Sequence, residues 1–196
     1  LAAQQNMIDF VEQLMLSRGE HDVLETVSGK KSLYRIYSDV RFSKDKSPYN
    51  PRFAFNMVRS GKRRRGGYYV NIRPGNNFLA CGFFAPNASA LRRLREDIAG
   101  SPEQWRAVLQ SHPLSEHFGP LQGEEVATAP RGYDKQQPGI EWIRHKQFIL
   151  RHDFTDDEVV APEFLQQVSA VFKAARPFLD LCTEVLTTDA NGQQID

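Results

Sequence analysis

The sequence YYVNIRPGNNFLACGFF, residues Tyr68–Phe84, has the pattern of two β-strands joined by a tight turn. In its first half an apolar set of side chains alternates with a more polar set, and the two sets are Tyr68, Val70, Ile72 and Tyr69, Asn71, Arg73. This period of two is typical of a strand with one buried and one solvent-facing side. The glycine and asparagines of residues 73–77 suit the turn, and residues 78–84 predict the returning strand. The stretch therefore predicts an antiparallel hairpin.

Other segments extend this hairpin into a larger α+β fold. Alternating or extended patterns predict further strands over Leu33–Phe42, Arg52–Ser60 and Gln147–Phe154. Apolar spacing and capping residues predict helices over 7–19, 87–100 and 101–109, a short helix from Thr155, and a C-terminal helix from Pro162 that Pro177 kinks or splits. We expect an antiparallel sheet of about five strands, helices packed on one face of it, and a long C-terminal helix.

Length and composition limit the class of protein. With 196 residues, 40% of them hydrophobic, the chain predicts a single α+β domain over 1–188 and a flexible tail over 189–196. The longest apolar runs are far shorter than the roughly 18 residues of a membrane span, so we expect no membrane partner. The two cysteines, Cys81 and Cys182, form neither a disulfide framework nor a zinc motif. We predict a cytoplasmic protein without a cofactor or a metal site.

Positive charge is concentrated in one part of the chain. Thirteen Lys or Arg and only two Asp lie between Lys30 and Arg73, a net charge of +11 in a chain whose total is +1. The rest of the sequence therefore carries −10, much of it after His152. Such segregation indicates either an anionic partner or an internal acidic one.

The alternation of the predicted strands gathers polar and cationic residues on one face of the sheet. We predict a small phosphate- or carboxylate-bearing ligand there, because arginine forks bind such groups through two hydrogen bonds. The predicted ligand-binding residues are Arg35, Asp39, Arg41, Lys44, Lys46, Tyr49, Tyr69, Asn71, Arg73 and Arg151. Two other interpretations stay open: these side chains are simply solvated, or the acidic C-terminal part of the chain docks on them.

Two alternative functions use the same region. In the first, the protein is an enzyme on an anionic substrate, with Asp39 as acid or base beside Arg35 and Arg41, although such a carboxylate should stay ionised. In the second, the basic hairpin tip GKRRRGG docks nucleic acid or an acidic protein through Lys62–Arg65. The sequence identifies neither the ligand nor the oligomeric state.

One motif resembles a known family. The stretch KSLYRIYSDVRFSKDKSPY, residues 31–49, is similar to the bacterial and fungal family called domain of unknown function 2461. The resemblance continues through GYYVNIRPG, PRGYD, APEF and RPFLDL and covers Lys30–Leu186. It implies a mixed α+β domain with no established activity. Family members usually carry an aromatic-rich segment before the first helix, so we expect that segment to be missing here. Gln137 stands where the family often has a histidine.

Overall fold

The computed structural model describes residues 2–19, 22–25, 28–37, 49–60, 66–189 and 191–195. Within them the chain forms one antiparallel sheet in the order β1-β2-β3-β4. The strands are β1 (Phe53–Val58), β2 (Gly67–Ile72), β3 (Asn77–Phe83) and β4 (Phe148–Phe154). The predicted hairpin is β2–β3, and each strand pairs with the next one along the chain.

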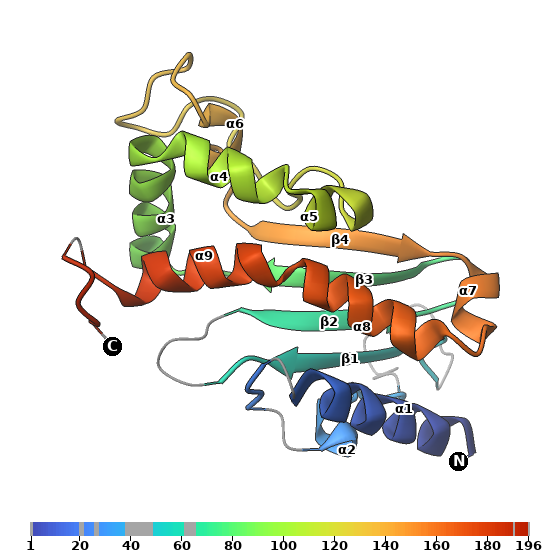
Figure 1. The fold of residues 1–196 in the computed structure, drawn as a ribbon. Coiled ribbons are helices and arrows are strands. Elements are labelled where there is room, and N and C mark those ends of the chain that lie inside the picture. The colour runs from blue at the N-terminus through green and yellow to red at the C-terminus, as the bar shows by residue number, and fades with distance from the viewer. Residues whose placement is uncertain are drawn as a thin grey trace.

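Helices surround this sheet on several sides (Figure 1). Their bounds are α1 (Ala2–Gly19), α2 (Gly29–Ser32), α3 (Ala88–Gly100), α4 (Pro102–Leu109), α5 (His112–His117), α6 (Ile140–Ile143), α7 (Asp156–Val160), α8 (Phe164–Ala174) and α9 (Arg176–Thr187). Helices α8 and α9 run across one face of the sheet, α1 and α2 lie beside β1, and α4 and α5 lie beyond β4. Helix α3 stands at the left of the view and reaches the end of α9. We call the face under α8 and α9 the helix-covered face and the opposite one the open face.

The helix ends follow the capping signals in the sequence. The Asn87 side chain accepts a hydrogen bond from the Ala90 amide at 2.8 Å and begins α3. Thr155 and Glu158 form a capping box at the start of α7. The C-terminal helix is split as predicted: α8 ends at Ala174, and Pro177 lies in the first turn of α9, where its missing amide hydrogen costs nothing.

The core lies between the sheet and its helices. Alternate strand residues such as Phe55, Tyr68, Leu79 and Leu150 are buried on the helix-covered face. The Tyr68 ring lies 4.6 Å from that of Phe172 in α8. Burying large apolar and aromatic side chains in this way is the main favourable contribution to folding.

The described residues contain four strands, whereas the sequence predicted about five. The missing strand is Leu33–Phe42, of which residues 38–42 lie outside the described residues. Its described part forms only isolated bridges, Leu33 with Phe55 and Tyr37 with Tyr49. Within the described ranges, no helix has both the length and the apolarity to cross a membrane. The domain limits and the flexible tail stay predictions.

Candidate functional site

The residues predicted to bind an anion do not form one cluster. Asp39, Arg41, Lys44 and Lys46 lie outside the described residues. Of the other six, Tyr69 and Arg151 line a cleft of about 790 Å³ on the open face of the sheet. The remaining four residues do not line this cleft: Arg35, Tyr49 and Arg73 are exposed elsewhere, and Asn71 is buried.

The strand register explains what lies in this cleft. One row across the open face reads Asn56, Tyr69, Ala80, Arg151, and the next reads Val58, Gly67, Gly82, Ile149. The cleft walls come from three segments, which lie after α2, after β3 and before α6. The lining residues there are Tyr34, Phe84, Ala85, Pro86, Gln122 and Gly123. The lining of the cleft is therefore mostly apolar, with Asn56, Tyr69 and Arg151 as the polar strand residues in these two rows.

The middle of the cleft floor has no side chains for a backbone reason. Gly82 has φ 138°, a conformation that other residues rarely adopt, and a Cβ there would lie 2.0 Å from the carbonyl oxygen of Phe148. A Cβ on Gly67 would lie 2.9 Å from the carbonyl oxygen of Met57. In the next row, Ala80 beside Gly82 contributes a methyl group, and Tyr69 beside Gly67 bounds the floor on that side. The floor is consequently backbone and small side chains over two strands.

Aromatic rings surround Tyr69 at one side of this floor. Its ring centroid lies 5.9 Å from that of Tyr34, 5.8 Å from that of Phe78 and 6.5 Å from that of Phe84. Tyr34 is 49% exposed and Phe84 40% exposed, large fractions for aromatic side chains in a cleft. An exposed apolar area with a concave shape is a common mark of a binding site.

Arg151 supplies positive charge to the cleft. Its guanidinium carbon lies 4.0 Å from the centroid of the Phe78 ring. Asp153 Oδ1 accepts hydrogen bonds from Nε at 2.9 Å and from Nη2 at 2.6 Å, and Asn76 Oδ1 lies 3.5 Å from Nη2. In the part of the chain that the structure describes, Nη1 has no hydrogen-bonding partner. One edge of the guanidinium is thus fixed, and the edge formed by Nη1 and Nη2 retains donors for another group.

The Tyr69 hydroxyl is a second polar group in the cleft. Burial is the main cause that raises the pKa of Tyr69 above its ordinary value; Arg52 acts against this rise and Tyr34 adds to it. Arg52 Nη1 lies 3.5 Å from the hydroxyl oxygen. Tyr69 is therefore neutral near pH 7 and can both donate and accept a hydrogen bond.

Asn71 and Arg73 belong to the turn between β2 and β3. The Asn71 side chain, only 2% exposed, donates to the carbonyl of Asn76 at 2.8 Å and lies 3.4 Å from Arg52 Nη1. The backbone amide of Arg73 donates to Asn77 Oδ1 at 2.9 Å, and the Arg73 side chain is exposed. Both residues stabilise the turn, and neither lines the cleft.

The predicted alternation around Tyr34 is wrong, because the structure shifts it by one residue. The sequence pattern placed Tyr34 with the buried side chains and Arg35 with Tyr69, but the ring that meets Tyr69 is that of Tyr34. The reason is that Leu33, which pairs with Phe55, packs against the core at this point. Arg35 is exposed and does not line the cleft.

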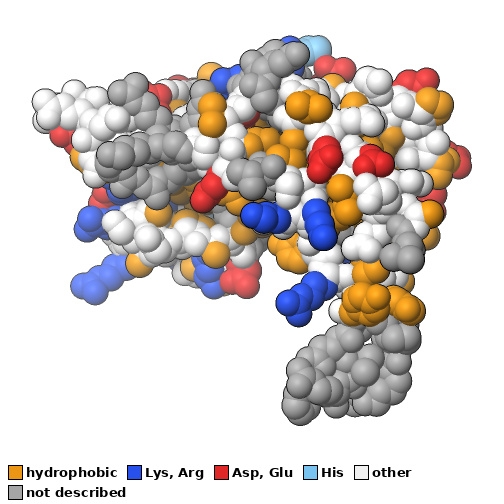
Figure 2. All heavy atoms as spheres, turned by 90° about the horizontal axis from the view of Figure 1, so that it is seen from below, with side chains coloured by type: hydrophobic (Ala, Val, Ile, Leu, Met, Phe, Trp, Pro, Cys, Tyr) orange, Lys and Arg blue, Asp and Glu red, His pale blue; other side chains and the backbone are white. Residues whose placement is uncertain are grey.

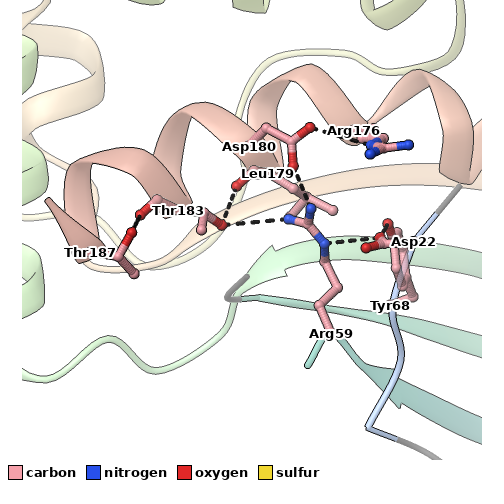
Figure 3. Close-up of polar contacts among 8 residues, drawn as sticks. All are labelled: Asp22, Arg59, Tyr68, Arg176, Leu179, Asp180, Thr183 and Thr187. Carbon is pink, nitrogen blue, oxygen red and sulfur yellow. Dashed lines mark hydrogen bonds and ion pairs between the residues drawn. The ribbon is translucent and has the colours of Figure 1, made fainter. Parts of the chain in front are cut away.

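The helix-covered face holds a second arginine, in a different environment (Figure 3). Arg59 is 2% exposed; its Nε pairs with Asp22 at 2.9 Å and its Nη2 with Asp180, while Nη1 lies 3.5 Å from the Thr183 hydroxyl. The Tyr68 hydroxyl donates to the same Asp22 oxygen at 2.6 Å. This buried network joins the segment after α1, the end of β1, strand β2 and helix α9.

The electrostatics of Arg59 follow from these partners. Burial is the largest influence on the pKa of Arg59 and acts to lower it, but the hydrogen bond to Asp180 and the charges of the neighbours outweigh it. The net pKa is raised, so the guanidinium is charged at every ordinary pH. Arg59 is a structural cation in a saturated site rather than a ligand-binding one.

An acidic side chain of the C-terminal part also holds the turn between β2 and β3. Asp156, in the predicted acidic helix start, accepts hydrogen bonds from the Gly75 amide at 2.9 Å and from Asn77 Nδ2 at 2.6 Å. Figure 2, viewed from the side of α1 and α2, shows basic side chains at separate points among acidic and hydrophobic ones. Internal pairing thus accounts for Arg59, and the described cations do not merge into one basic surface on that side.

The sequence did not predict that Tyr34, Phe78 and Phe84, or the floor glycines Gly67 and Gly82, belong to the site. A signal for part of this set exists in Phe78–Phe84, where both alternating sets are apolar or small. A strand without a polar face indicates that both sides are covered or concave. Among the described residues, no group of three or more His, Cys, Asp or Glu could hold a metal ion.

Comparison with known proteins gives one match. No curated protein and no solved structure matches the chain. A family described as "Conserved hypothetical protein (DUF2461)" matches residues 1–181. This match covers the α1 helix, the whole sheet and most of the helices around it. The chain therefore belongs to the DUF2461 family of conserved hypothetical proteins.

Proposed function

We propose that this protein binds a small organic anion, with an apolar body and one carboxylate or phosphate group, in the cleft on the open face. The observation that carries the proposal is Arg151, whose guanidinium is held against Phe78 and Asp153 while Nη1 has no partner among the described residues. An arginine fixed in this way loses less conformational freedom on binding than a mobile one would. Asp153 holds the guanidinium on one edge and leaves the other for a ligand.

The size and chemistry of the cleft support the same function. A volume of about 790 Å³ is in the range of sites that enclose small molecules. Most of its lining is apolar, and the side chains with polar groups on it include Tyr34, Asn56, Tyr69, Gln122 and Arg151. A mainly apolar site with a few placed polar groups fixes the orientation of a ligand and supplies affinity through burial.

Binding fits these residues better than catalysis. The described residues that line the cleft include no His, Cys, Ser, Thr, Asp, Glu or Lys. General acid–base and nucleophilic catalysis draw mainly on those side chains. The phenol of Tyr69 has a raised pKa, which makes it a poor base near pH 7. We therefore propose a binding protein.

The test compares one charged with one neutral ligand of equal shape. Isothermal titration calorimetry with 2-naphthoate and 2-naphthamide should show tighter binding of the acid to the parent protein. In Arg151→Gln this preference should disappear, a loss of about ten- to a hundredfold for the acid, because one charged hydrogen-bonding group is removed. The matched control is Arg73→Gln, which removes an exposed arginine that does not line the cleft.

Two results would overturn the proposal. The parent protein could bind acid and amide equally, which would show that no cation contributes. Alternatively, Arg73→Gln could weaken binding as much as Arg151→Gln, which would show that only the overall positive charge matters.

A further inference from the structure

We infer that the ligand of this cleft is planar and aromatic, an aromatic acid that lies flat on the sheet between the Tyr69 side and the Ile149 side. This inference rests on the proposed function and names the class of ligand. It starts from the shape of the floor, the surrounding rings and the position of Arg151.

The floor favours a flat body because it is formed by backbone. In neighbouring positions of β2 and β3, Gly67 pairs with Gly82 and Tyr69 with Ala80. Neither glycine can accept a Cβ without a clash with a backbone carbonyl oxygen. A planar group contacts such a floor over its whole area, whereas a puckered ring touches it at a few atoms and leaves gaps that forfeit dispersion energy.

The surrounding rings favour an aromatic body. Tyr34 and Phe84 stand at 76° and 70° to the Tyr69 ring, and Phe78 at 41°. Aromatic pairs prefer such inclined or offset geometries at centroid distances of roughly 4.5–7 Å. A further ring can join this cluster and cover the exposed surfaces of Tyr34 and Phe84.

The register places the charge at one end of the floor. Arg151 pairs with Ala80, and Ile149 pairs with Gly82, so the cation and the apolar side chain are two residues apart on the same edge of the floor. A ring over Gly82 and Ala80 therefore lies within a short reach of Arg151. The acid group belongs at that end, and the apolar end of the ligand faces Val58 and Ile149.

The experiment compares 2-naphthoate with decahydro-2-naphthoate, which has the same charge and carbon skeleton but is not flat. Calorimetric titration of the parent protein should give at least about tenfold tighter binding of the aromatic acid. Ala80→Leu should weaken 2-naphthoate at least about tenfold, because its side chain fills the space above the floor. The matched control is Ala107→Leu on the exposed side of α4, which should bind like the parent. Thermal unfolding of both variants checks that they fold.

The outcomes separate the two proposals. If both acids bind equally and both depend on Arg151, the protein binds anions but not specifically planar ones, and this inference is wrong. The inference is also wrong if Ala80→Leu binds 2-naphthoate like the parent. If neither acid is preferred over the neutral 2-naphthamide, the proposed function itself is wrong. The ligand comparison uses the parent protein alone, so it decides the question even if Ala80→Leu does not fold.

Discussion

Arg59 and Arg151 lie on opposite faces of the same sheet, and their surroundings differ. Arg59 is buried, and each of its three nitrogens has a partner among Asp22, Asp180 and Thr183. Arg151 is held on one edge by Asp153, lies over an aromatic ring, and borders a cleft. An arginine whose three nitrogens all have partners stabilises the fold, whereas one with spare donors beside an apolar cavity is available for a ligand.

The largest expected effect is the loss of stability on removing the buried cation. Arg59→Met should lower the free energy of unfolding by about 3–5 kcal/mol, because the buried Asp22 carboxylate would lose its ion pair with Arg59. Arg151→Met, on the open face, should change it by less than about 1 kcal/mol. Urea denaturation followed by circular dichroism measures both. Equal effects of the two substitutions would contradict the structural difference between the two arginines.

The second prediction concerns the backbone of the cleft floor. Gly82→Ala should lower the free energy of unfolding by more than about 2 kcal/mol, because the new Cβ meets the Phe148 carbonyl oxygen and φ is unfavourable for alanine. Gly75→Ala serves as the control: Gly75 also has positive φ, but a Cβ there meets nothing within 4 Å. If both substitutions cost the same, the close approach at Gly82 contributes nothing, and the reason given for the flat floor fails.

The adjacent tyrosines Tyr68 and Tyr69 point to opposite faces of the sheet, so their hydroxyls should contribute differently to stability. Tyr68→Phe should cost about 1.5–3 kcal/mol of stability, because its hydroxyl donates to the buried carboxylate of Asp22. Tyr69→Phe should stay within about 0.5 kcal/mol, because the contact of its hydroxyl within the described ranges is a long one, with Arg52. Thermal and urea unfolding of the two variants test this. A larger loss for Tyr69→Phe would mean that the two faces have been assigned the wrong way round.

The smallest expected effect is a pH dependence that neither arginine can produce. His145 is buried, its Nδ1 has no partner in the described chain, and its Nε2 lies 3.4 Å from Glu125. Burial is the main cause that lowers the pKa of His145; Arg144 acts in the same direction and Glu125 against it. The unfolded chain then takes up a proton near pH 6.5, while the folded one resists it until a lower pH.

The protein should therefore become less stable as the pH falls. Stability from neutral His145 is fully present above about pH 6.5 and is lost as the pH falls through the lower folded-state pKa. Urea unfolding between pH 7 and 5 should show this decline in the parent protein and a smaller slope in His145→Leu. An unchanged slope in the variant would assign the acid sensitivity to other groups.

Much of the fold could be predicted from the sequence because local patterns determine it. The alternation in Tyr68–Ile72, the Asn87 cap and the proline in α9 all correspond to observed elements. The faces of the first predicted strand could not be predicted in the same way. Leu33, Tyr34 and Ile36 are all apolar or aromatic, so the pattern does not determine which of them packs against the core. Only the tertiary contact of Leu33 decides it.

The candidate site was predicted only in part, for a physical reason. Charge is visible in a sequence, and Tyr69 and Arg151 were found from the alternation of polar and charged residues with apolar ones. The concave shape arises where glycines without side chains lie side by side. The sequence does not reveal that Gly67 and Gly82 are neighbours on adjacent strands. The register between β2, β3 and β4 supplies that information.

We propose that the open face, and not the basic segment Lys62–Arg65, binds the ligand. Titration of isotope-labelled protein with 2-naphthoate, followed by two-dimensional ¹H–¹⁵N NMR, tests it directly. We predict saturable shifts of the amide signals of Tyr69, Ala80, Gly82 and Arg151, with little change in α3 and α9. Shifts confined to Lys62–Arg65, with the signals of the cleft unchanged, would contradict the claim.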